Sequence, residues 1–188
     1  TSFTLVFDVL VASNIDNVGE IAIDSADNIY LTYYVYANGS YSGSKLCKCN
    51  TSGTLVSSID LNNWYLCASR KGSTGVYIFS YINGNGLKHY NASLALVAQN
   101  TSVTEFNYMH SMAVDNDGYV FVGGNYGSSS SPVIGYSPDL STKIYKLEQA
   151  SYAIVRTHAT NGRVVAACYV NGHGDAIRMY ETKTTIAY

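Results

Sequence analysis

The sequence predicts an all-β fold: a β-propeller of four four-stranded blades, or a fragment of a larger propeller. Three observations support this prediction. A β-rich unit recurs along the chain, with equivalent strands starting at residues 29, 76, 120 and 164. Each unit has a turn signal between β-rich segments, and no window keeps the 3.6-residue period of a helix. The second strands of the first two units are apolar at successive positions, which indicates sheets covered on both faces, as propeller blades are.

The repeat is clearest in two predicted hairpins, residues 21–31 and 112–122. Each begins with a short apolar strand that ends in an aspartate, Asp24 or Asp115, and continues through a polar turn into a second strand. An aspartate at this position can accept hydrogen bonds from the backbone N–H groups of the turn. We therefore expect both carboxylates to stabilise their turns.

The other strands follow at a similar spacing. Third strands are expected over residues 44–50, 86–91, 132–137 and 176–181, and fourth strands over residues 55–61, 94–99 and 143–148. Residues 1–6 are similar to residues 51–56, which begin a fourth strand. The expected single domain thus opens with the fourth strand of a split blade, residues 1–13, and continues with blades over residues 19–61, 64–102 and 109–148 and an incomplete blade over residues 152–188. In a closed ring the two terminal segments would share one blade.

The strand-turn-strand pattern of residues 21–31 and 112–122 resembles the β-propeller repeats of the NHL and SBBP types. The resemblance extends over about the whole chain and concerns the fold. It implies a propeller of the kind found in adhesins, secreted bacterial proteins, phage tail proteins and a minority of enzymes. The units lack the basic residues with which RNA-binding NHL propellers engage their ligands.

Composition narrows the classes of partner. Charged residues make up only 13% of the chain and the net charge is −2, with no cluster of Lys and Arg, so no nucleic-acid partner is expected. The apolar run near the N-terminus, residues 4–12, is too short for a membrane span. The 18 tyrosines and many Ser, Thr, Asn and Gly residues predict a neutral, hydrogen-bonding surface. The start at Thr1 indicates either a cleaved leader or precursor, or an excerpt of a longer chain.

The cysteines allow disulfides of undetermined pairing or free buried thiols. Cys47 and Cys49 share one face of a predicted strand, but metal binding would need two more ligands nearby. The sequence therefore predicts no metal site, and it indicates no cofactor. Cys49 also aligns with Tyr90 and Tyr136 of other units, which favours a packing role. The candidates for disulfides are Cys47, Cys49, Cys67 and Cys168.

No nucleophile elbow, phosphate loop or paired-histidine motif is present in the sequence. His110 and His158 fall in or beside predicted first strands, which line the central channel of a propeller. They could meet Asp24 and Asp115 there around a ligand or ion, and structural histidines are the alternative. Catalytic carboxylates would have to come from different units.

Two segments predicted as loops, residues 34–43 and 125–131, mix tyrosine with Ser, Gly and Asn. That composition is typical of recognition surfaces, in which rigid rings stand beside adaptable hydrogen-bonding groups. The predicted ligand-binding tyrosines are Tyr34, Tyr36, Tyr41 and Tyr126. Four Asn-x-Ser/Thr sequons would be glycosylation acceptors in a glycosylating export pathway, namely Asn38, Asn50, Asn91 and Asn100.

Together these features predict a non-enzymatic, exported propeller of the cell or virion surface, such as a phage tail or fibre component. Its expected role is adhesion to or recognition of a glycan or protein surface, or structural assembly. One alternative is a homo-oligomer or extracellular filament assembled by strand exchange through the split blade. The other is a propeller glycosidase or lyase acting in the central channel.

Overall fold

The computed structural model describes residues 15–63, 65–69, 74–80, 86–103, 106, 108–125, 131–150, 152–158, 163–170 and 174–181. These residues confirm the predicted all-β class, and no helix among them could cross a membrane. The strands are β1 (Ile15–Ile23), β2 (Ile29–Ala37), β3 (Ser40–Cys49), β4 (Leu55–Leu61), β5 (Tyr65–Ala68), β6 (Val76–Ser80), β7 (Leu87–Tyr90), β8 (Leu96–Asn100), β9 (Tyr108–Val114), β10 (Val120–Asn125), β11 (Ser131–Tyr136), β12 (Lys143–Ala150), β13 (Tyr152–His158), β14 (Arg163–Val170) and β15 (Gly174–Glu181).

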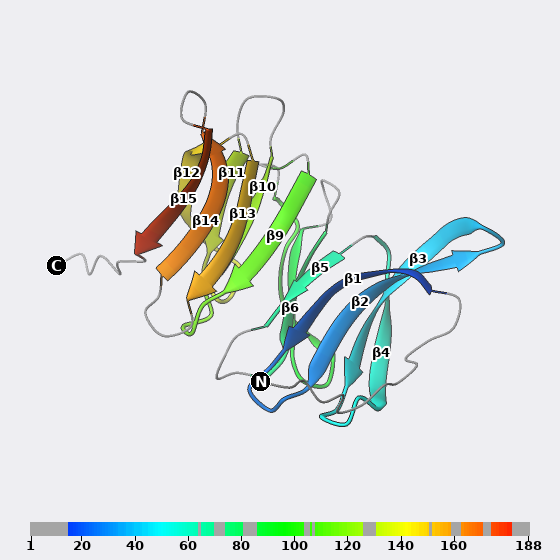
Figure 1. The fold of residues 1–188 in the computed structure, drawn as a ribbon. Helices are drawn as coiled ribbons and strands as arrows, with labels where there is room; N and C mark the ends of the chain where they lie inside the picture. The colour runs from blue at the N-terminus through cyan, green and yellow to red at the C-terminus, as the bar shows by residue number, and fades with distance from the viewer. Residues whose placement is uncertain are drawn as a thin grey trace, which may run out of the picture.

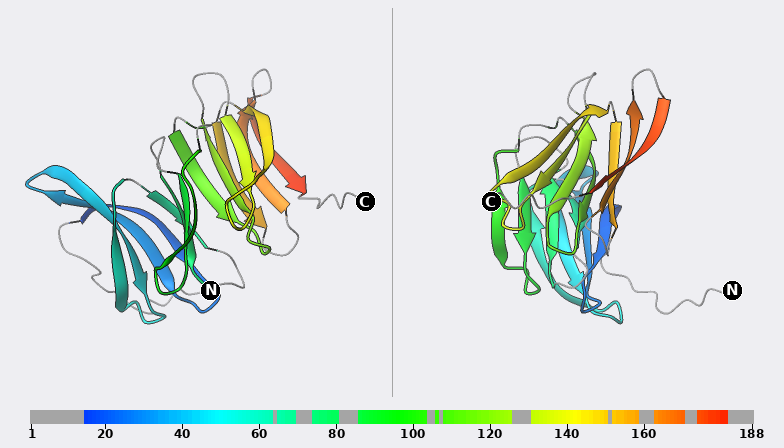
Figure 2. Two further views of the ribbon diagram at one scale, coloured as in Figure 1. Left: turned by 180° about the vertical axis from the view of Figure 1, so that it is seen from behind. Right: turned by 90° about the vertical axis from the view of Figure 1, so that its left-hand side faces the viewer.

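The strands form four antiparallel sheets in chain order, each a simple meander. Sheet 1 is β1–β4, sheet 2 is β5–β8, sheet 3 is β9–β12, and sheet 4 is β13–β15 with three strands. Successive sheets meet along their first strands, since β1 contacts β5, β5 contacts β9, and β9 contacts β13. Figure 1 shows the result as an open row, with sheets 1 and 4 at opposite ends, and Figure 2 shows the same row from behind and from the side.

A common turn joins the strands within sheets 1 and 3. In the first hairpin the Asp24 N–H donates to the Asn28 carbonyl at 3.1 Å, and the Asp27 N–H donates back to the Asp24 carbonyl at 3.1 Å. The fourth residue of this turn is left-handed, with φ of 56° at Asp27 and 89° at its counterpart Gly118. Glycine, aspartate and asparagine tolerate that backbone best, which explains the polar turn signals in the sequence.

The interface between sheets 1 and 2 is a continuous apolar cluster. Tyr30 and Leu46 of sheet 1, both 0% exposed, pack in this cluster with Tyr65 and Ile78 of sheet 2. Burying a large apolar side chain stabilises a fold by about 1.5–3 kcal/mol. The Thr32 hydroxyl adds a polar link between the sheets by donating to the Tyr65 carbonyl at 2.8 Å.

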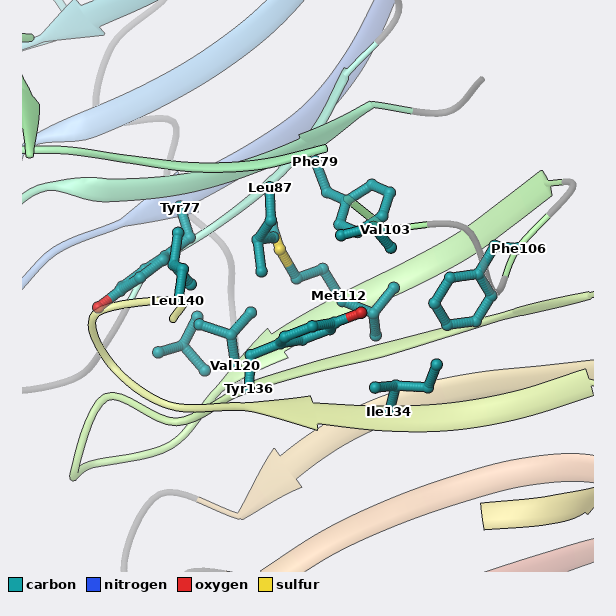
Figure 3. Packing of buried hydrophobic residues seen from close by; sticks show 12 residues of the cluster. Tyr77, Phe79, Leu87, Val103, Phe106, Met112, Val120, Ile134, Tyr136 and Leu140 are labelled. Atoms are coloured by element: carbon teal, nitrogen blue, oxygen red, sulfur yellow. The ribbon is translucent and has the colours of Figure 1, made fainter. Parts of the chain in front are cut away.

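The interface between sheets 2 and 3 repeats this arrangement one unit later. Tyr77, Phe79 and Leu87 of sheet 2 face Met112 and Tyr136 of sheet 3 (Figure 3). Every residue of β6 is buried, so this strand is covered on both faces as its uninterrupted apolar sequence predicts.

The observed strands fall where the repeat places them, with one correction. Residues 34–43, predicted as an aromatic loop, are mostly strand, because β2 and β3 continue to a two-residue turn at Asn38 and Gly39. These residues have φ of 53° and 75°, the left-handed pair that a type I′ hairpin requires. The predicted N-terminal strand, residues 1–13, and the last residues of the incomplete unit lie outside the described residues.

Candidate ligand-binding site

Three of the predicted tyrosines come together on the β2–β3 hairpin. The Tyr41 ring meets Tyr34 edge-on, with centroids 6.4 Å apart and planes at 65°. It meets Tyr36 in the same way, at 6.1 Å and 77°. Edge-to-face contacts of this kind hold aromatic rings in fixed relative positions. Tyr34 is buried while Tyr41 is 37% exposed, so the cluster has an anchored base and an open ring.

The hairpin projects past the end of its own sheet (Figures 1 and 2). The first residue of β3 that pairs with β4 is Ser44, opposite Leu61, so Ser40–Gly43 extend beyond β4. A register shift between Val35 and Tyr36 and a hydrogen bond from the Ser42 hydroxyl to the Val35 carbonyl, at 3.2 Å, shape this extension. The tyrosines are therefore presented on a projecting β-ribbon.

A pocket of about 390 Å³ lies beside the end of β4, near Leu61, where β3 continues into the projecting hairpin. Lys45 and Asp60 form an ion pair within it, and the Asp60 side chain is 82% exposed. The remaining lining combines an aromatic ring, serine hydroxyls and an amide: Val35, Tyr41, Ser42, Gly43, Ser44, Leu61 and Asn62. Paired charge, hydroxyls and an aromatic edge suit a neutral ligand rich in hydroxyl groups.

The fourth predicted tyrosine, Tyr126, lies outside the described residues. The two histidines lie on inner strands but at different levels. The register pairs Val114 with Val120 and Thr157 with Val164, which gives His158 the repeat position of Asp115, five residues beyond that of His110. At about 3.3 Å per strand residue, these positions are roughly 15 Å apart along the strand direction. The backbone therefore does not bring both histidines to one end of the inner strands.

Asp24 is engaged by its own turn and by the next sheet. Its Oδ1 accepts from the N–H groups of Ala26 at 2.9 Å and Asn28 at 3.0 Å. Its Oδ2 accepts from the Tyr30 hydroxyl at 2.9 Å and the Gly75 N–H at 3.2 Å. Burial alone would raise the pKa of Asp24, but the hydrogen bonds from Asn28, Gly75 and Tyr30 outweigh it and lower this pKa.

Asp115 begins the same kind of turn, but only one of its two carboxylate oxygens has hydrogen-bond partners. Its Oδ1 accepts from the N–H groups of Asp117 at 3.0 Å and Tyr119 at 2.9 Å, whereas its buried Oδ2 has no hydrogen-bond partner. Burial is the dominant influence and raises the pKa of Asp115. The turn-stabilising role predicted for Asp24 and Asp115 is confirmed.

The described cysteines are buried free thiols. Cys47, Cys49 and Cys67 form no disulfide, so the predicted disulfides are not made by these three, and the side chain of Cys168 lies outside the described residues. Burial raises the pKa of both Cys47 and Cys49, which keeps them protonated. Within the described part of the chain, no group of three His, Cys, Asp or Glu side chains could hold a metal ion.

The sequons occupy different structural settings. Asn38 is exposed at the tip of the β2–β3 turn. Asn50 and Asn91 begin outer turns, where each Oδ1 accepts from the N–H groups two and four residues further on. The Asn100 Oδ1 accepts from the Ser102 N–H at 2.9 Å, and its side-chain amide also donates to the Leu140 carbonyl of sheet 3 at 3.0 Å. Glycosylation stays a prediction, with Asn38 the most accessible acceptor of these four.

No family model and no curated protein matches the chain. Its fold is similar to a Dos1 propeller at 14% identity and a TM-score of 0.56, covering 91% of this chain and 49% of that one. It is also similar to KlAtg21, from a complex with the coiled-coil of AgAtg16, at 12% identity and a TM-score of 0.62, covering 88% and 52%. A computationally designed protein, Ika4, matches at 8% identity and a TM-score of 0.61, covering 96% and 99%.

These likenesses show the fold alone. The chain is a β-propeller fragment in architecture, built of four successive blades, and it spans about half the length of the first two structures named. Because no family model matches, the resemblance to NHL and SBBP-type repeats stays at the level of the propeller fold. Enzymes also occur among the matched structures, so the fold does not decide between binding and catalysis.

The sequence indicated the tyrosines but not the pocket beside them. The dipeptide Asn38-Gly39 is a strong sequence signal for a two-residue β-hairpin turn, and this turn joins the two strands that carry the tyrosines. Lys45, Asp60 and Asn62 carried no sequence signal, because their proximity depends on where β4 ends relative to β3.

Proposed function

We propose that the protein is a non-enzymatic recognition module that binds a glycan through the β2–β3 hairpin. One observation supports this above all: the exposed Tyr41 ring, held by Tyr34 and Tyr36, borders a pocket lined by hydroxyls, an amide and one ion pair. Sugars offer an apolar ring face and a rim of hydroxyls, which match an aromatic ring and a polar, charge-balanced wall. A protein surface is the second candidate, because tyrosine-rich ribbons bind both.

The low charge of the chain and its hydroxyl-rich surface favour a place at a cell or virion surface, as in an adhesin or a phage tail or fibre component. The glycosidase or lyase alternative requires two carboxylates on either side of a sugar bond, about 5–10 Å apart. Asp24 and Asp115 are used by their turns, and Asp60 is paired with Lys45, which favours binding over catalysis.

A glycan array followed by calorimetry on the best ligand tests the proposal. Tyr41→Ala should weaken binding about tenfold or more, which corresponds to 1.4 kcal/mol. Asp60→Asn should also weaken binding, because it disrupts the ion pair in the pocket wall. Tyr119→Ala is the matched control, since this tyrosine lies in the turn between β9 and β10.

The outcomes separate the candidates. Binding that resists both Tyr41→Ala and Asp60→Asn would place the ligand elsewhere and defeat the proposal. An array without any bound glycan would defeat the glycan assignment. Release of shortened sugars from a bound glycan, detected by mass spectrometry, would show that the protein is an enzyme.

A further inference from the structure

The peptide bond at the tip of the β2–β3 hairpin joins an exposed asparagine to an exposed glycine. Asn38 and Gly39 both have left-handed backbone, with φ of 53° and 75°. The hairpin carries them away from the body of sheet 1 (Figure 1). A Cβ placed on Gly39 would meet no heavy atom within 4 Å, so no described residue beyond its chain neighbours packs on that side of the glycine.

The side chain of Asn38 differs from those of the other three sequon asparagines. The Oδ1 atoms of Asn50, Asn91 and Asn100 each accept from the backbone N–H two residues further on, at distances between 2.9 and 3.1 Å. In the described part of the chain, neither the Asn38 side chain nor the Gly39 N–H has a hydrogen-bond partner. The carboxamide of Asn38 and the backbone nitrogen of Gly39 are therefore free to react with each other.

The reaction open to these two groups is the closure of a five-membered ring. Hydroxide removes the proton of the Gly39 N–H, the nitrogen attacks Cγ of Asn38, and Nδ2 takes a proton from water and leaves as ammonia. Glycine favours the attack because it has no Cβ to shield its nitrogen. Water then opens the cyclic imide at either carbonyl. Opening at the side-chain carbonyl gives aspartate, and opening at the main-chain carbonyl gives isoaspartate, in which the chain runs through Cγ.

We propose that Asn38 is a site of spontaneous deamidation in the folded protein, and that the isoaspartate product disrupts the tyrosine cluster of the β2–β3 hairpin. Ring closure requires the turn to open, and the pair that closes the turn, Ala37 with Ser40, is itself exposed. Residues 29–44 carry no charged side chain, so either product also places the first charge on this part of the hairpin.

Isoaspartate lengthens the main chain of the tip by one carbon atom. A two-residue type I′ turn fixes the register of the strands that it joins, so the added atom disturbs the pairing of Ala37 with Ser40 and of Tyr36 with Tyr41. The edge-on contact of the two tyrosine rings, with centroids 6.1 Å apart, depends on that pairing. Aspartate tolerates left-handed backbone and should keep the turn. The effect on binding rests on the proposed function of the hairpin, whereas the deamidation does not.

The chemistry is tested by ageing the wild-type chain, made in a host that does not glycosylate asparagine, for several weeks at neutral pH. Peptide mapping should find the mass change of an NH₂-to-OH exchange at Asn38, and electron-based fragmentation should identify isoaspartate among the products. The mapping must resolve single sites, because four other Asn-Gly dipeptides have asparagines outside the described residues. Since exposed loop tips are accessible, the rate should lie within about tenfold of that in a synthetic peptide of residues 34–43. A folded chain that keeps Asn38 intact while the peptide deamidates would overturn the proposal.

The structural consequence is tested by hydrogen exchange, which needs no ligand. Residues 34–43 should exchange faster in the isoaspartate fraction than in the fresh chain, and fresh Asn38→Asp should match the fresh wild type. Asn38→Gly is the matched control, because Gly-Gly also suits a type I′ turn and cannot deamidate at this position. Unchanged exchange in the isoaspartate fraction, or equally faster exchange in aged Asn38→Gly, would overturn the disruption of the cluster.

Glycan binding by the same samples separates this inference from the proposed function. The isoaspartate fraction should bind the best glycan of the array more weakly than fresh wild type, while aged Asn38→Gly should keep its affinity. Full affinity in the isoaspartate fraction would overturn the link between the modification and binding. If the fresh chain binds no glycan, the proposed function fails, and the modification and its effect on hydrogen exchange are still decided by the measurements above.

Discussion

The turns at Asp24 and Asp115 have the same backbone and nearly opposite electrostatics. In both, Oδ1 accepts two backbone N–H groups of the turn at about 3 Å. They differ at Oδ2, which has hydrogen-bond partners in Asp24 and none in Asp115. Two of the Oδ2 partners of Asp24 are lost by substitution, because Tyr119 and Phe121 replace Asn28 and Tyr30, and the third partner, the Gly75 N–H, belongs to the next sheet.

This difference separates two jobs that one side chain can do. In both units Oδ1 accepts hydrogen bonds from the backbone N–H groups of the turn and so stabilises the turn conformation. The second oxygen decides whether the buried carboxylate is stabilised as an anion, and it depends on residues outside the four-residue turn. Hydrogen bonds lower the pKa of Asp24, while burial raises the pKa of Asp115.

The largest expected effect comes from removing the charge of the fully bonded carboxylate. Asp24→Asn should lower the free energy of unfolding by about 3 kcal/mol at neutral pH, because it turns an acceptor into a donor facing other donors. Urea unfolding measures this loss. Asp27→Asn, an exposed aspartate in the same turn, is the control and should change stability little. Equal losses in both variants would show that charge, rather than the Oδ2 contacts, matters.

The hydrogen bond from the Tyr30 hydroxyl to Asp24 should contribute a separately measurable part of the free energy of unfolding. Tyr30→Phe keeps the buried ring but removes the hydrogen bond to Asp24, at an expected cost of about 2 kcal/mol. Thermal and urea unfolding should agree on the loss. A neutral result would mean that Asn28 and Gly75 satisfy the Asp24 carboxylate without the hydroxyl.

The reverse substitution in sheet 3 should stabilise the protein. Phe121 stands at the position of Tyr30 and pairs with Ala113 as Tyr30 pairs with Ala22. Phe121→Tyr places a hydroxyl where it can donate to the unpartnered Oδ2 of Asp115, for an expected gain of about 1 kcal/mol. Destabilisation would show that sheet 4 leaves no room for the added oxygen.

Much of this fold could be predicted from the sequence because it repeats. The strand over residues 120–125 and the start of β2 at residue 29 were predicted to the residue, because two copies of one pattern can be aligned with each other. The continuation of β2 to residue 37 was not predicted. The link from Gly75 to Asp24 could not be predicted, because it joins residues 51 apart across two sheets. The exposure of Ile21 and Ile23 could not be predicted either, because both have the same apolar character as the buried Met112 and Val114 of sheet 3.

The smallest expected effect is the most informative about charge. Asp115→Asn keeps the Oδ1 acceptor and removes a buried, half-satisfied anion, so its stability at pH 7 should lie within about 1 kcal/mol of the wild type. The sign of its pH dependence follows from the raised pKa of Asp115 in the folded state. Ionisation then disfavours folding as pH rises from the unfolded-state pKa of about 3.9, and the variant escapes that loss.

Asp24, with its lowered pKa, behaves in the opposite way. Its contribution is present above about pH 4 and declines as pH falls through the folded-state pKa, so the penalty of Asp24→Asn should shrink in acid. Relative to the wild type, Asp115→Asn should improve from pH 3 to pH 7 while Asp24→Asn worsens. Urea unfolding at both pH values measures the two slopes. Slopes of the same sign would mean that the second carboxylate oxygen does not set the electrostatics of these turns.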